Sequence, residues 1–257
     1  MLIAAWGPEK SGKSKIALSK PQPIYCADFD LGLEGALEHY SGIKIEAPKY
    51  PLPIVLNLGV GIILNVRELW EKYVLEFVSV LEDKKLYQNK EPFKSIVVAS
   101  TTQMQRTVRR AILQMKQEAQ LTRWSSGKKR ADEELRSSLL QIEYGEPNAK
   151  MQTIIYAPKQ YGKHMFLTHY ETEEYKDQLV KDEVKSMATG KMVMEGFKDT
   201  VGLVDLVLLT STKKNNGKIE FYATITHSRL HAGLTDMTLR DPTYDSIIEA
   251  LNMLRGE

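Results

Sequence analysis

Gly7-Pro8-Glu9-Lys10-Ser11-Gly12-Lys13-Ser14 is the stretch that decides the fold of this chain. It follows the apolar run 2–6, which has the right length for a buried parallel strand, and it leads into the apolar opening of a helix at 15–18. A strand, the pattern G-x-x-x-x-G-K-S and a helix, in that order, are the context of a phosphate-binding P-loop. The sequence therefore predicts a P-loop fold of the α/β class that binds a nucleoside triphosphate.

The spacing within this octapeptide suits phosphate chemistry. Gly7 and Gly12 permit backbone angles that a side chain disfavours, so that successive amides can form an anion nest with the start of the helix. Lys13 is expected to neutralise the β and γ phosphates, and the Ser14 hydroxyl to bind Mg²⁺. We therefore expect ATP and Mg²⁺ as cofactors, held by residues 7–14. The alternative is a glycine-rich turn with a solvated lysine.

Composition narrows the class of protein further. At 257 residues, the chain can form one α/β domain over 1–257, with 37–64 and 170–200 as irregular loops or insertions. Lys and Arg number 35 against 33 Asp and Glu, so any contact with nucleic acid must come from a local patch. The single cysteine, Cys26, excludes an internal disulfide, and no apolar run approaches membrane-spanning length. With no signal-peptide pattern at the start, we expect a soluble cytoplasmic protein.

An acidic pair follows the second predicted strand, 24–27. Asp28 and Asp30 alternate on an extended chain, so both are expected on one face at the carboxyl end of the sheet, where ligands bind in open α/β folds. A carboxylate there can orient or deprotonate an attacking water. We favour Asp30 for this role, with Asp28 or Glu34 as substitutes. The alternative is that one carboxylate caps the following helix.

The remaining elements follow from periodicity. Helices are predicted from Asn65, capped by an N-x-x-E pattern, over 102–120, within 132–160 and from Asp241, with a break at 145–147. Strands are predicted at 93–100, 163–169, 204–209 and 219–226, and short strands are possible at 54–56 and 62–64. The pair Asn216-Gly217 predicts a hairpin between the last two long strands. Residues 170–200 are predicted as a loop or a β-hairpin excursion.

The octapeptide and the acidic pair together resemble the RecA family, whose P-loops typically open with Gly-Pro-Glu. The similarity covers 1–36 and is patchy thereafter, and it resembles most closely the phage-encoded RecA-like ATPases of single-strand annealing and recombination. The resemblance implies a RecA-like core with a mostly parallel central sheet and antiparallel edge strands. It further implies action on single-stranded DNA, self-association as a ring or filament, and a place in the host cytoplasm.

The resemblance also implies roles for single residues. Asp30 stands where the family has its catalytic carboxylate, and His169 resembles the residue that senses the γ phosphate, although a core histidine is the alternative. Arg229 matches the arginine of a Lys-x-Arg-x-Gly signature that reaches a neighbour's ATP, with His227 where the lysine stands. A surface arginine is the alternative. Ala99 stands where the family has the Walker B aspartate, so less negative charge surrounds the metal, Asp28 can compensate as a metal ligand, and the rate of hydrolysis is left open.

A basic segment follows the helix predicted at 102–120. A tryptophan beside clustered cations can stack a nucleobase while the cations hold phosphates, so candidate nucleic-acid contacts are Arg123, Trp124, Lys128, Lys129 and Arg130. The alternative is a loop whose tryptophan packs on its own domain and whose cations face water. By position alone, Lys181, Lys185 and Lys191 are further candidates.

Three functions fit the sequence. The favoured one is a RecA-like ATPase that acts on single-stranded DNA in viral or phage recombination or replication. A non-hydrolysing, nucleotide-dependent annealing or scaffold protein is the first alternative, because of Ala99. A small-molecule kinase, with 170–200 as its lid, is the second.

Overall fold

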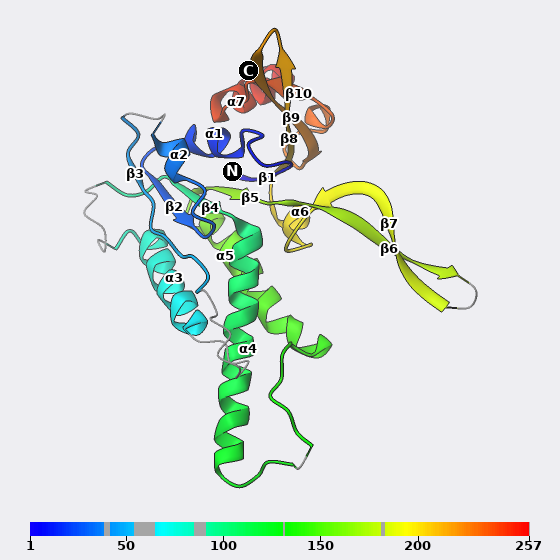
Figure 1. Cartoon of the computed structure of the whole chain (residues 1–257). Helices are drawn as coiled ribbons and strands as arrows, with labels where there is room; N and C mark the ends of the chain where they lie inside the picture. Colours follow the sequence, from blue (N-terminus) through cyan, green and yellow to red (C-terminus); the bar gives the residue numbers. More distant parts are fainter. Residues whose placement is uncertain (39–41, 54–64, 85–90, 131, 181–182, 257) are drawn as a thin grey trace.

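An eight-stranded sheet forms the centre of the computed structural model, which describes residues 1–38, 42–53, 65–84, 91–130, 132–180 and 183–256 (Figure 1). The strand order is β10-β9-β8-β1-β5-β4-β2-β3. Parallel pairing joins β8, β1, β5, β4, β2 and β3, whereas β9 and β10 are antiparallel at one edge. The mostly parallel sheet with antiparallel edge strands is therefore confirmed.

The strands of this sheet have the bounds β1 Leu2–Trp6, β2 Ile24–Asp28, β3 Ile45–Glu46, β4 Ser95–Ala99, β5 His164–Thr168, β8 Leu206–Asn215, β9 Lys218–Ser228 and β10 Thr238–Arg240. The four strands β1, β2, β4 and β5 are apolar along almost their whole length, as parallel strands covered on both faces require. The Asn216-Gly217 turn, with φ values of 47° and 79°, closes the β8–β9 hairpin as predicted.

Helices cover both faces of the sheet. Side chains of α3 (Val66–Leu81), α4 (Thr101–Ser125) and α5 (Gly145–Gln160) share one apolar core with alternate strand residues such as Leu2 and Ala4. Side chains of α1 (Lys13–Leu18) and α7 (Tyr244–Arg255) share the other core with the residues between them, such as Ile3 and Ala5. Successive side chains along each strand therefore point into opposite cores, and the sheet with helices on both faces forms three layers.

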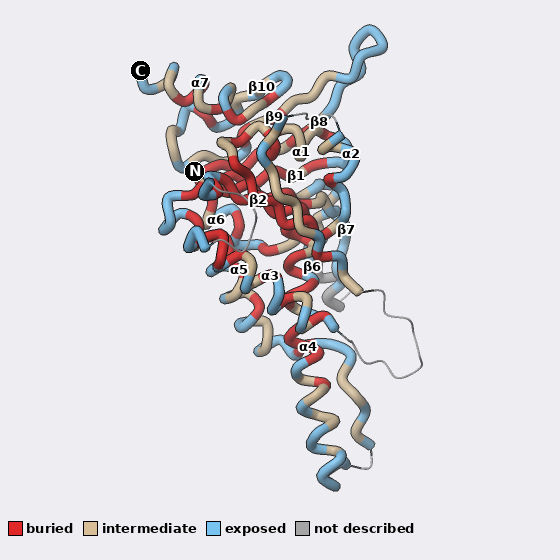
Figure 2. The backbone as a smooth tube through the Cα atoms, turned by 90° about the vertical axis from the view of Figure 1, so that its left-hand side faces the viewer, coloured by how far each residue is buried: buried red, intermediate tan, exposed pale blue. Residues whose placement is uncertain are grey.

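Two segments project from the three-layered core of the fold (Figure 1). The distal half of α4 and the returning residues 126–130 and 132–140 form an arm, which is exposed or half-buried over most of its length (Figure 2). β6 (Glu171–Val180) and β7 (Glu183–Met194) form a long two-stranded hairpin. Of the two predictions for 170–200, the hairpin is therefore confirmed and the irregular loop is wrong.

Several predicted boundaries need correction. Residues 132–140 are not helical, and Gly145-Glu146-Pro147 begins α5 rather than breaking a helix, because proline fits the first turn, where its missing N–H is not needed. The 3₁₀ helix η1, Gln141–Tyr144, precedes it. Asn65 precedes α3 but makes no side-chain capping bond. The short strands predicted at 54–56 and 62–64 lie outside the described residues.

The smaller elements are α2 (Glu34–Leu37), α6 (Thr200–Leu203) and the 3₁₀ helix η2 (Ala232–Leu234). Among the described residues, every helix is too short or too polar to cross a bilayer.

Candidate nucleotide-binding site

A cavity of about 310 Å³ opens at the carboxyl ends of the parallel strands, where ligands bind in open α/β sheets. Five of the predicted site residues meet there, namely Glu9, Lys10, Lys13, Ser14 and Asp30. The rest of its wall consists of Gly32, Leu33, Ala99, Thr168 and Tyr170. The fold therefore brings the P-loop and the catalytic candidate Asp30 to one cavity.

The two glycines of the P-loop motif, Gly7 and Gly12, have no room for a side chain. Gly7 has φ 137°, and a Cβ there would lie 2.3 Å from the carbonyl oxygen of Thr210. Gly12 has φ 93°, and a Cβ would lie 2.9 Å from Cδ1 of Phe221. Both angles are in the region that favours glycine, so the loop's path depends on these two residues.

Strand β8 contacts the P-loop through Thr210. Ser11, which is buried, lies 2.6 Å from the Thr210 hydroxyl through its Oγ and donates to the Pro8 carbonyl at 2.7 Å. Thr210 donates in turn to the carbonyl of Trp6 at 3.0 Å. Sequence reasoning missed Thr210 because nothing in the octapeptide points to a residue about 200 positions away.

Lys13 donates hydrogen bonds to the P-loop itself. Its Nζ donates to the carbonyls of Gly7 and Pro8, both at 2.7 Å. Burial lowers the pKa of Lys13, while the carboxylates of Glu171, Glu9 and Asp30 oppose that shift. The ammonium groups of Lys13 and Lys10, which also lines the cavity, are the positive charges that an anion there would meet.

Asp30 is held by two hydrogen bonds. Its Oδ1 accepts from the amide of Gly32 at 3.1 Å, and its Oδ2 accepts from the hydroxyl of Tyr170 at 2.9 Å. The carboxylate therefore has a defined orientation at the wall of the cavity. Tyr170 is a second residue that sequence reasoning missed, since a tyrosine one position after His169 carries no motif.

Asp28 departs from expectation. Strand β2 ends at Asp28, whose side chain is buried and does not line the cavity. Burial first, and the neighbouring Asp30 carboxylate second, raise the pKa of Asp28 to about 6. The expectation that both carboxylates face the phosphate site is therefore wrong, because only Asp30 turns toward it. Glu34, the other substitute, pairs with Lys49 instead.

The donor set at the cavity fits a triphosphate with a hydrated Mg²⁺. Lys13, Ser14 and Asp30 all line the cavity. Ala99 ends β4 in the cavity wall, so this strand end offers a methyl group rather than a carboxylate to a metal ion. Ser14 is consequently the one predicted metal ligand that lies at the cavity.

His169 lies behind the wall rather than in it. Its side chain is fully buried, and its Nδ1 lies 3.0 Å from the Glu195 carbonyl at the end of the β6–β7 hairpin. Burial lowers the pKa of His169 to about 4, so its ring is neutral at pH 7. Because side chains alternate along the chain, Thr168 and Tyr170 line the cavity while His169 points away. The expectation that His169 faces the phosphate site is therefore wrong.

Arg229 is exposed and follows the carboxyl-terminal end of β9, which lies beside the amino-terminal end of β1 and therefore away from the cavity. Its amide donates to the carbonyl of Asp205, and Asp205 in turn pairs with the amino-terminal end of β1 through Leu2. The P-loop follows the carboxyl-terminal end of the same strand. Arg229 thus cannot serve the cavity of its own chain, and a role at a neighbour's cavity stays a prediction.

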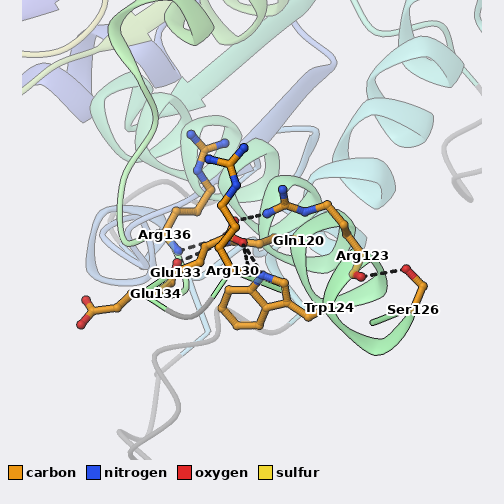
Figure 3. A network of polar contacts seen from close by, with 8 residues as sticks. All are labelled: Gln120, Arg123, Trp124, Ser126, Arg130, Glu133, Glu134 and Arg136. Carbon is orange, nitrogen blue, oxygen red and sulfur yellow. Dashed lines mark hydrogen bonds and ion pairs between the residues drawn. The ribbon is translucent and has the colours of Figure 1, made fainter. Parts of the chain in front are cut away.

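The basic candidates lie at the tip of the arm (Figure 3). Arg123 and Trp124 belong to the last turn of α4, not to a loop. Glu133 of the returning segment pairs with Arg123 and accepts from the indole Nε1 of Trp124 at 3.0 Å. The Nζ of Lys129 lies 4.5 Å from the Trp124 ring centroid. These contacts match the alternative in which the tryptophan packs on its own domain, while Lys128 and Arg130 expose their side chains.

No protein-family model and no curated protein matches the chain. Solved structures with a similar fold include a KaiC-like protein from Pyrococcus horikoshii OT3, with 14% identity, 89% of this chain and 79% of that chain covered, and a TM-score of 0.43. They also include the RadB recombinase, with 10% identity, 93% and 85% covered, and a TM-score of 0.48. The chemistry of the cavity therefore has to follow from its own residues.

Proposed function

We propose that this chain binds Mg²⁺-ATP at the P-loop cavity and hydrolyses it, as a RecA-like ATPase of the phage-encoded type. The observation that carries the proposal is a loop whose two glycines exclude any side chain, with Lys13, Ser14 and Asp30 in the wall of one cavity. A glycine-rich turn with a solvated lysine would need neither the buried Ser11–Thr210 support nor a carboxylate opposite.

Each of these residues has one task. Lys13 leaves the carbonyls of Gly7 and Pro8 and neutralises the β and γ phosphates. Asp30 orients the attacking water and accepts its proton. Ser14 supplies a hydroxyl to Mg²⁺, which when bound offsets charge on the phosphates.

The proposal extends to single-stranded DNA and to assembly. The exposed Lys128 and Arg130 at the tip of the arm can neutralise backbone phosphates. Arg229, at the edge of the sheet away from its own cavity, can complete the cavity of the next copy in a ring or filament. These two features support a protein that works on DNA as an oligomer, in recombination or replication.

The direct test is calorimetry with Mg²⁺-ATP on the wild type, on Lys13→Ala and on Lys150→Ala. Lys150 lies on α5, where it pairs with Glu146 at the surface, and serves as the matched control. We expect heat from the wild type and from Lys150→Ala, and a loss of affinity of about 100-fold in Lys13→Ala, as for a charge-assisted contact. No heat from the wild type refutes the proposal.

Phosphate release, measured with and without a single-stranded oligonucleotide, tests the catalytic and DNA parts. We expect turnover that rises with the oligonucleotide, and binding that weakens as salt rises. Turnover that is the same with and without the oligonucleotide, together with no binding at low salt, contradicts the DNA part.

A second function is favoured by Ala99. With a methyl group where a carboxylate could attract Mg²⁺, the cavity can hold nucleotide without turning it over, and the chain would then be a nucleotide-stabilised annealing or scaffold protein. Tight binding of ATP without phosphate release distinguishes this function from the first. The kinase alternative gains no such support, because the β6–β7 hairpin projects outward from the body (Figure 1).

A further inference from the structure

Tyr170 sits where the cavity meets the base of the β6–β7 hairpin. It follows β5 directly and precedes β6, and its half-buried ring lines the cavity beside Thr168. Its hydroxyl donates to Oδ2 of Asp30 at 2.9 Å. The contact joins residues 140 positions apart, so only the folded sheet produces it.

The backbone of Tyr170 is fixed from two directions. Its amide donates to the Thr102 hydroxyl at 3.2 Å, and its carbonyl accepts from the amide of Glu195 at 2.9 Å. Thr102 also donates to the carbonyl of Glu195 at 3.1 Å. The start of α4 and the end of β7 therefore fix the backbone from which the side chain of Tyr170 projects.

Asp30 depends on this phenol for its orientation. Its other partners lie along the same turn, namely the amide of Gly32, which donates to Oδ1, and the neighbouring Asp28 carboxyl. A carboxylate held only by groups of its own turn can rotate about its χ2 angle with that turn, whereas a bond from a separate element restricts this rotation. Loss of the hydroxyl also frees Asp30 to turn toward the Lys13 ammonium, whose charge it already feels.

We propose that Tyr170 is a positioning residue for the reaction, which aims the Asp30 carboxylate at the attacking water through its hydroxyl. The inference rests on the proposed function, since it requires that Asp30 acts on a water at the γ phosphate. Tyr170 touches neither the water nor the phosphate in this role. It acts through Asp30 alone.

The test uses Tyr170→Phe, Asp30→Asn and the double variant, with Tyr156→Phe as the matched control. Tyr156 is an exposed tyrosine on α5, away from the cavity. We expect Tyr170→Phe to keep the Kd and KM for Mg²⁺-ATP within about twofold and to lower kcat about tenfold, which equals about 1.4 kcal/mol. Tyr156→Phe is expected to match the wild type.

The double variant separates positioning from a general structural role. In the Asp30→Asn background, adding Tyr170→Phe should leave kcat unchanged, because the group it positions is already gone. An unchanged or higher kcat in Tyr170→Phe, or effects of the two substitutions that multiply, would overturn the inference.

A second readout needs no activity. In urea unfolding of the nucleotide-free protein, the same four-member cycle should show coupling between Tyr170 and Asp30 of about threefold or more in the unfolding constant. If the effects of the two substitutions on the unfolding constant simply multiply, so that there is no coupling, the inference is overturned. If the wild type releases no phosphate, the catalytic part of the proposed function fails, and this cycle still decides whether the hydroxyl holds the carboxylate.

Discussion

Replacing Lys20 by methionine should stabilise the protein most strongly at and below neutral pH. Lys20 is fully buried, and its Nζ has no hydrogen-bond partner among the described residues. It lies 4.8 Å from the ring centroid of Tyr244 and 5.8 Å from that of Phe166. Methionine has a similar length and no charge, so it keeps the packing and removes the buried amine.

The magnitude follows from the pKa of this amine. Burial lowers the pKa of Lys20 from 10.5 to about 7, and the attraction of Asp205 opposes the shift only in part. The other charged groups that it influences nearby are the amino group of Met1 and His164. A difference of about 3.5 between unfolded and folded pKa values corresponds to at most about 5 kcal/mol.

The sign is set by proton binding. Below pH 7 both states carry the proton, and the folded protein bears the full cost of a buried charge. Between pH 7 and 10.5 the unfolded chain binds more protons than the folded one, so the stability of the wild type rises with pH. The advantage of Lys20→Met should therefore fall by about 2–3 kcal/mol between pH about 6.5 and about 9.5.

Urea unfolding of both proteins at these two pH values gives the result directly, because titrating groups that Lys20 does not influence cancel in the difference. Lys163→Met is the matched control, since Lys163 is also buried but donates to Asp83 at 2.6 Å and to the Phe93 carbonyl at 2.9 Å. It should destabilise the protein by about 1–3 kcal/mol. If Lys20→Met gave the same stability difference at both pH values, or destabilised at pH about 6.5 as Lys163→Met does, the reasoning would be refuted.

Three further experiments test the site. Gly12→Ala places a Cβ 2.9 Å from Phe221 at φ 93°; we expect ATP affinity to fall at least about tenfold and stability by about 1–3 kcal/mol, and unchanged calorimetric affinity would contradict this. Thr210→Val removes the hydroxyl that meets Ser11; it should cost about 1–2 kcal/mol in urea unfolding, with Thr210→Ser restoring most of it. Arg229→Ala and Lys13→Ala, each inactive alone, should regain phosphate release when mixed, and no recovery in mixed oligomers argues against an arginine shared between copies.

The sequence alone was enough for the P-loop and for most of the parallel strands. The octapeptide 7–14 is a local device, because its glycines, lysine and serine act through neighbouring backbone, and the strand that precedes it is apolar on both faces. Asp30 was found in the same way, one residue pair beyond a strand whose end must reach the sheet edge. Patterns of this kind are carried by residues close together in the chain.

Only the tertiary structure decided which side chains complete the cavity. In the sequence, Asp28 and His169 are both good candidates to line the cavity, yet Asp28 is buried and His169 contacts the base of the β6–β7 hairpin. Tyr170 and Thr210 contact Asp30 and Ser11, although no motif predicts either contact. The physical reason is that a side chain's direction at a strand end depends on where the strand stops and what packs behind it. Those contacts come from residues up to about 200 positions away, and no local spacing encodes them.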